Sequence, residues 1–151
     1  MKNTHKLFTT LLLLAGPLLF SAPAFAAEHV VKMLNNGAGG MMIFEPAALS
    51  VNVGDTVKFE ATDMAHNTAS VLTPAGATPW RGAMNEEVSI TLNTPGVYVY
   101  ECTPHAMMAM VGVIKVGSGP VDSATLTFAE QYKSKFVMNN NRLDVYLSEV
   151  E

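Results

Sequence analysis

The stretch that decides the fold, residues 97–116, reads VYVYECTPHAMMAMVGVIKV. It contains two runs of alternating or β-branched residues, Val97–Cys102 and Val111–Val116, and such runs are typical of strands. Cys102 ends the first run, and Pro104 stiffens the turn that follows it. The centre of the predicted structure is therefore a pair of strands around a short loop that holds a cysteine, a histidine and several methionines.

Upstream of this pair lie four more runs of the same kind, at His29–Leu34, Leu49–Val53, Thr56–Ala61 and Glu87–Leu92. Turn signals rich in glycine and proline separate the runs, as at Asn36-Gly37, Gly39-Gly40 and Thr94-Pro95-Gly96. Many short strands joined by such turns predict an all-β fold, a Greek-key β-sandwich.

The pattern changes after residue 120. Apolar residues there recur near a 3.6-residue period, as expected of an amphipathic helix: Leu126, Ala129, Tyr132 and Phe136. Asp122 or Ser123 is the predicted N-cap of this helix. A second amphipathic segment runs from Asn141 to Glu149. We therefore predict two short C-terminal α-helices that pack on the sandwich.

The first residues have the pattern of a secretory signal peptide. Lys2 and Lys6 precede an apolar run, Leu7–Phe20, and Ala24-Phe25-Ala26 supplies small residues for cleavage. The apolar run is too short to span a bilayer, which takes about 20 residues. We predict a signal peptide at residues 1–26 and one soluble, exported domain at residues 27–151.

The predicted mature chain is acidic. The full sequence has 9 lysines and arginines against 13 aspartates and glutamates, a formal net charge of −4. Cleavage removes two lysines and no acid, so the net charge becomes −6. This charge argues against nucleic acid and anionic membranes as partners, and it permits attraction to a basic protein surface.

Cys102 is the single cysteine of the chain. In an oxidising compartment an unpaired thiol is expected to be buried or held by a metal. His105 and Met110 follow in the same loop, which thus offers a thiolate, an imidazole and a thioether. Completed by a second imidazole, this set is typical of copper sites that transfer single electrons. A buried structural thiol is the alternative, and zinc could occupy the same ligands.

His66 is the predicted second imidazole. The mature chain offers only His29, His66 and His105, and His29 lies almost at the terminus, where we expect a solvated side chain. The spacing of Met110 from His105 predicts the axial thioether, with Met108 as the alternative.

Two polar residues directly follow predicted ligands. Asn67 comes after His66, and Thr103 comes after Cys102. A hydrogen bond between them would tie the two ligand-bearing segments together. Ordinary turn chemistry is the alternative explanation for both residues.

With these residues in place, the chain resembles the pseudoazurins, type 1 blue copper proteins of the cupredoxin superfamily. The resemblance covers nearly all of residues 27–151 and rests on GMMIFEP at 40–46, VGDTV at 53–57, His66-Asn67, PGVY at 95–98, and residues 102–110. Plastocyanins share the spacing from Cys102 to Met110, but a plastocyanin-like chain would end soon after Val116. The extension to Glu151 resembles the two-helix tail of pseudoazurins. Amicyanins have a shorter interval, which would select Met108.

The resemblance implies a cupredoxin-like sandwich that binds one type 1 copper and carries one electron at a time in the periplasm. It implies four ligands, which are His66, Cys102, His105 and Met110. It places Asn67, Thr103, Pro104 and Met42 around them. The ring edge of His105 is implied to reach the surface within an apolar electron-transfer patch that includes Met41, Met42, Met107 and Met108. The implied partners are redox proteins that dock transiently, such as a copper nitrite reductase, a cytochrome c or a dehydrogenase, and we expect a monomer.

One departure concerns charge. Pseudoazurins commonly surround this patch with lysines, and by register this chain has Asn36, Met64 and Glu101 at such positions. Our hypothesis is that the protein docks through its methionine-rich apolar face, or with a basic or weakly charged partner.

A copper-handling protein that binds and delivers the metal through its methionines is the alternative function. An enzyme is not expected, because the sequence shows no nucleophile with a base, no carboxylate pair and no phosphate-binding glycine loop. Four protein ligands would also leave no open coordination position for a substrate.

Overall fold

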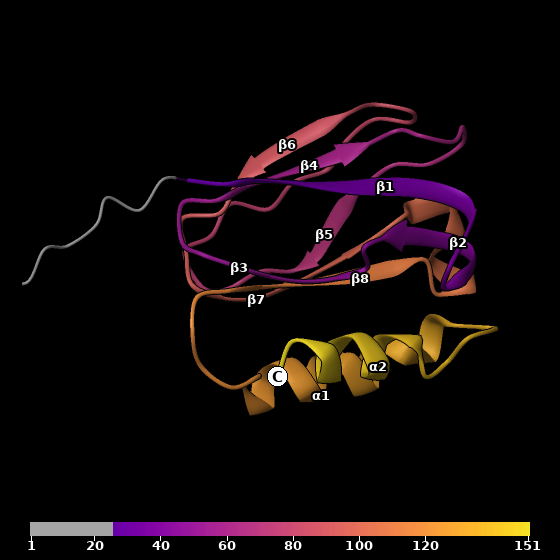
Figure 1. Cartoon of the computed structure of the whole chain (residues 1–151). Coiled ribbons are helices and arrows are strands. Elements are labelled where there is room, and N and C mark those ends of the chain that lie inside the picture. The colour runs from indigo at the N-terminus through magenta and orange to yellow at the C-terminus, as the bar shows by residue number, and fades with distance from the viewer. Residues whose placement is uncertain (1–25) are drawn as a thin grey trace, which may run out of the picture.

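The computed structural model describes residues 26–151, so the predicted signal peptide lies outside the described residues except for Ala26. Eight strands form two four-stranded sheets (Figure 1). One sheet has the order β2-β1-β4-β6, with bounds Gly40–Glu45, Glu28–Gly37, Thr56–Glu60 and Val88–Thr91. The other has the order β3-β8-β7-β5, with bounds Ala48–Val51, Val111–Val116, Gly96–Glu101 and Ala69–Leu72. The prediction of an all-β cupredoxin-like sandwich is confirmed.

Both sheets are mixed. β1 pairs with β2 in an antiparallel hairpin whose turn joins Gly37 to Gly40, and with β4 in parallel. β8 pairs with β7 in antiparallel register, from Gly96↔Val116 to Glu101↔Val111, and with β3 in parallel. The two strands predicted around the Cys102 loop are therefore neighbours at the centre of their sheet.

β7 is buried along almost its whole length because its sheet is covered on both faces. Tyr98 and Tyr100 belong to the core between the sheets, whereas Val97 and Val99 belong to the core under the helices. Tyr100 packs edge-on against Phe44 with ring centroids 4.7 Å apart. Gly112 permits this packing, since a Cβ there would lie 2.3 Å from the Tyr100 ring.

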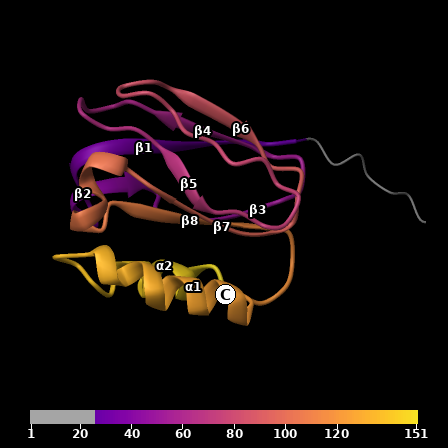
Figure 2. The same cartoon turned by 180° about the vertical axis from the view of Figure 1, so that it is seen from behind.

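The C-terminal helices are α1, Ser123–Tyr132, and α2, Arg142–Glu149, joined through a 3₁₀ turn, η2, at Lys133–Lys135. Asp122, one of the two N-caps that the sequence predicted, caps α1 by accepting a 2.6 Å hydrogen bond from the Thr125 amide. Figures 1 and 2 show both helices against the sheet that contains β7 and β8. None of the helices in residues 26–151 is long and apolar enough to cross a membrane.

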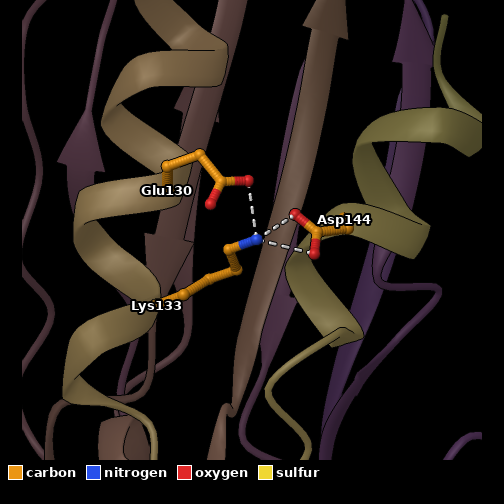
Figure 3. Close-up of polar contacts among 3 residues, drawn as sticks. All are labelled: Glu130, Lys133 and Asp144. Carbon is orange, nitrogen blue, oxygen red and sulfur yellow. Dashed lines mark hydrogen bonds and ion pairs between the residues drawn. The ribbon is translucent and has the colours of Figure 1, made fainter.

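Lys133 links the two helices. Its Nζ lies 2.8 Å from a Glu130 carboxylate oxygen on α1 and 2.8 Å from Asp144 Oδ2 on α2 (Figure 3). Both acidic partners are substantially exposed, so we expect this ion-pair cluster to contribute little to stability.

Two strands, β2 and β5, were not predicted. β2 consists of the apolar run after the Gly39-Gly40 turn signal, which does not alternate. β5 has only four residues and ends in two adjacent apolar ones, Val71 and Leu72. β5 also changes register between Ser70 and Leu72 where it pairs with β7. Both strands therefore lack the period-2 pattern by which sequence indicates a strand.

Candidate metal centre

The predicted thiol and imidazoles converge at one end of the sandwich, which we call the site end. Cys102 Sγ lies 3.6 Å from His66 Nδ1 and 3.4 Å from His105 Nδ1. The three donor atoms all lie within 4.8 Å of one another. Cys102 follows the end of β7, His105 lies in the 3₁₀ helix η1, Thr103–Met108, and His66 lies in the segment between β4 and β5.

The loop after Cys102 folds back on itself. The His105 amide donates to the Cys102 carbonyl over 3.0 Å, and Pro104 occupies the first turn of η1, where its missing N–H costs nothing. Ala109 ends η1 with a left-handed backbone, φ 57°. The Cys102 amide then donates to the Met110 carbonyl over 2.9 Å, and the Met110 side chain is fully buried in the same core cluster as Cys102. Met108 is only partly buried, which favours Met110 over Met108 as the thioether ligand.

Asn35, at the site end of β1, orients the His66 ring. His66 Nε2 lies 3.0 Å from the Asn35 side-chain oxygen, which can only accept. Nε2 therefore carries the ring proton, and Nδ1 points its lone pair toward Cys102. A ring nitrogen held by a carbonyl while the other is free is the usual arrangement of a metal-binding histidine.

Burial favours the uncharged forms of His66 and Cys102. It lowers the pKa of His66, with a smaller contribution from His105. Burial also raises the pKa of the Cys102 thiol, against the backbone N–H groups of Asn67 and His105, which lower it. A bound cation would lower the pKa of the Cys102 thiol instead, because the ligand of a metal is the thiolate. Two imidazole nitrogens and one thiol in contact, with a buried thioether in the same core cluster, are a donor set that fits copper.

Asn67 and Thr103 are hydrogen-bonded to each other. The Thr103 amide donates to the Asn67 side-chain oxygen over 2.8 Å, and the Asn67 amide nitrogen lies 3.4 Å from the Thr103 hydroxyl. Arg81 adds a bond that the sequence did not indicate, since its guanidinium donates to the same hydroxyl over 3.2 Å. The two segments that carry His66 and Cys102 are therefore tied together directly.

His105 reaches the surface in part, whereas His66 is fully buried. Of the predicted patch, Met41 and Met107 are exposed, and Met42 and Met108 are partly buried. Met64 and Met84 are exposed as well. Met64 lies two residues before His66, and Met84 precedes Asn85, whose amide donates to the His66 carbonyl.

The structure changes two expectations from the sequence. His29 is solvated only in part: its side chain is 29% exposed, and its Nε2 lies 2.9 Å from the buried Asp55 carboxylate. Glu101, which the register placed with the residues around the patch, does not lie at the surface. It is buried, and its carboxylate accepts a hydrogen bond from Tyr132 of α1. Both side chains found partners in distant segments that the sequence does not connect to them.

Comparison with known proteins agrees with this geometry. The family described as "Copper binding proteins, plastocyanin/azurin family" matches residues 31–117. A pseudoazurin from Paracoccus pantotrophus is 37% identical over 138 residues, covering 90% of this chain and 92% of the relative. The crystal structure of a pseudoazurin from Methylobacterium extorquens AM1 superposes with a TM-score of 0.71 and 36% identity, over 82% of this chain and 99% of that one. Native pseudoazurin from Hyphomicrobium denitrificans gives the same TM-score, 0.71, at 36% identity.

The chain therefore belongs to the plastocyanin/azurin family of copper-binding proteins, the cupredoxins. Within that family it groups with the pseudoazurins, which match it over most of their length. The predicted cofactor, copper, is confirmed by this membership.

Proposed function

We propose that this protein is a one-electron carrier that holds a single copper through His66, Cys102, His105 and Met110. The observation that carries the proposal is the contact of one unpaired thiol with two imidazole nitrogens at the end of a rigid sandwich. Copper bound there supplies the change between Cu(II) and Cu(I). The protein's contribution is to keep its donors in one arrangement that suits both oxidation states.

The surrounding residues hold that arrangement. Asn35 fixes the His66 ring, and the Asn67–Thr103 pair joins the two ligand-bearing segments. Fully buried His66 and Cys102 keep water away from one side of the site. Partly exposed His105 offers a short route for electrons to the surface.

We further propose that residues 27–151 are the mature cupredoxin domain, working as a monomer in the periplasm after removal of residues 1–26. This rests on the leader pattern of the sequence. Its partners are redox proteins that dock transiently at the methionine-rich face around His105, with a copper nitrite reductase, a cytochrome c and a dehydrogenase as candidates. Burial of Glu101 removes one acidic group from that face, which supports docking through apolar contacts.

The visible spectrum of the purified, copper-loaded protein tests the central proposal. We expect an intense thiolate-to-Cu(II) band that disappears on reduction and returns on reoxidation. Met110→Ala should keep the band, because the thiolate remains, and should shift the reduction potential. A colourless Cu(II) form would refute the carrier.

Electron-exchange rates measured against salt test the docking. An apolar face predicts rates that change little with ionic strength. A steep loss of rate with added salt, measured with an acidic partner, would contradict this.

Copper handling remains the second candidate, because Met41, Met64, Met84, Met107 and Met138 are all about half exposed or more. Thioethers are soft ligands that suit Cu(I). Titration with Cu(I) under anaerobic conditions separates the two functions. A carrier binds one ion per chain, and a handler binds further ions that the exposed methionines hold.

A further inference from the structure

Arg142, the first residue of α2, contacts two backbone segments, the β1–β2 hairpin and the loop from Cys102 to Met110. Its Nη1 donates to the carbonyls of Met42 over 3.0 Å, Ala109 over 3.2 Å and Met41 over 3.3 Å. Its Nη2 donates to the Gly39 carbonyl over 3.4 Å. One side chain thus joins the β1–β2 hairpin to the loop that carries Met110.

Two of these acceptors belong to strained residues. Met42 and Ala109 both have left-handed backbones, with φ of 49° and 57°. Residues with a Cβ rarely adopt this conformation, and it persists only where the surroundings impose it. Since Arg142 donates to the carbonyls of both, its guanidinium is one of the groups that impose it.

The position of Arg142 is unfavourable for its own helix. A cation at a helix N-terminus opposes the macrodipole, where an acidic residue would be stabilising. Arg142 is also 9% exposed and is the only lysine or arginine among the buried residues of the described chain. Within residues 26–151 no carboxylate pairs with it. A buried cation balanced by carbonyl dipoles alone is costly, so helix stability does not explain it.

We propose that Arg142 is a positioning residue for the copper site, which it serves in two ways. Its planar fork fixes the backbone just before Met110 and around Met42. Its buried charge favours the reduced site, because Cu(II) with a thiolate carries one more positive charge than Cu(I) with a thiolate. The inference rests on the proposed function, since it concerns the same site.

Arg142→Met and Arg142→Lys separate the two effects. Methionine removes both fork and charge, so we expect a lower reduction potential and an altered thiolate spectrum. Lysine keeps a charge but cannot reach several carbonyls in one plane. It should alter the spectrum while leaving the potential closer to that of the unmodified protein.

Lys133→Met is the matched control. Lys133 is also a cation in the helix layer and ties α1 to α2, but its partners are the carboxylates of Glu130 and Asp144 rather than backbone carbonyls of the ligand loop (Figure 3). This variant removes a cation and loosens the helices while the Arg142 hydrogen bonds to Met42 and Ala109 stay in place. It should change neither the potential nor the spectrum.

A measurement on the metal-free protein completes the test. In Arg142→Lys, amide hydrogen exchange in the loop from Thr103 to Met110 should be roughly fivefold faster, as expected for the net loss of one hydrogen bond. Lys133→Met should leave these rates unchanged. Equal potentials, spectra and exchange rates in the Arg142 and Lys133 variants would overturn the inference. An unmodified protein without a thiolate band would instead refute the proposed function, while the exchange measurement would still decide the role of Arg142 in the loop.

Discussion

The two ends of the sandwich hold polar clusters of opposite character. At the end opposite the site, which we call the Asp55 end, Asp55 is 2% exposed and accepts hydrogen bonds from the Ala27 backbone nitrogen, His29 Nε2 and the Asn52 amide, each 2.9 Å. These bonds, that from the Ala27 nitrogen first, lower its pKa to about 2. The cluster is charged and fully satisfied by the protein. At the site end, burial keeps the thiol and His66 uncharged, and their donor atoms face one another. The donor atoms of this second cluster are arranged to bind a cation.

The two ends also differ in which residues have a positive φ. Positive φ at the Asp55 end falls on glycines, such as Gly54 at 94°. The five non-glycine residues with positive φ in the described chain all lie in segments at or against the site end: Met42, Ala65, Asn85, Ala109 and Asn139. Strain of this kind gathers at functional sites. The comparison shows that one end is built for stability and the other for a fixed arrangement of ligands.

The largest expected effect is that of Cys102→Ser. Removing the thiolate should abolish the visible band of the copper-loaded protein completely, because that band needs sulfur. The melting temperature of the metal-free protein should change little, since the hydroxyl fills nearly the same space. Asp55→Asn should show the opposite result, with the band kept and the melting temperature lowered. A coloured Cys102→Ser protein would contradict the ligand assignment.

Asn35→Ala should weaken copper binding by roughly 10–100-fold, the usual effect of losing a residue that orients a metal-binding histidine. Competition with a chromophoric chelator measures the affinity. Asn36→Ala is the control, because Asn36 is the exposed next residue of the same strand. Equal losses in the two variants would show that Asn35 does not act through His66.

Asp55 should account for most of the stability that the Asp55 end loses in acid. Its carboxyl has an ordinary pKa of 3.8 and a pKa of about 2 in the folded protein. The contribution to stability is therefore full above 3.8 and is lost as the pH falls through 2. Denaturant midpoints of the metal-free protein between pH 6 and pH 2 should fall more steeply than those of Asp55→Asn in this window. Parallel curves would contradict the prediction.

The smallest effect concerns the backbone. Gly54→Ala should cost roughly 1 kcal/mol in the free energy of unfolding, because φ is 94° and no atom lies within 4 Å of the added Cβ, so that only strain remains. Ala65→Gly at the site end should stay within about 0.5 kcal/mol, since relief of strain offsets the greater freedom of the unfolded chain. Urea denaturation of both metal-free variants measures this. A larger loss in the free energy of unfolding for Ala65→Gly than for Gly54→Ala would contradict this difference between the two ends.

Sequence could predict the parts of the molecule that depend on local pattern. Six strands were predicted from alternating or β-branched runs. Both helices were predicted from their apolar period, and α1 also from its N-cap. Cys102 and His105 share one loop, so their proximity is nearly a local property, whereas His66 required elimination among three histidines. Asn35 bonds to His66 across 31 positions, and Arg142 bonds to Ala109 across 33. Such partners depend on tertiary contact, and no local signal distinguishes them from other polar residues.

The chain enters the fold at the Asp55 end. Ala26 and Ala27 are exposed, and Figure 1 shows that β1 begins at the end of the sandwich opposite the β1–β2 turn. A tether joined upstream of Ala26 would keep the Ala27 contact with Asp55 and hold the copper face outward. Immobilised in this way on an electrode, every molecule would present His105 to solution, and its current would report on docking partners rather than on orientation.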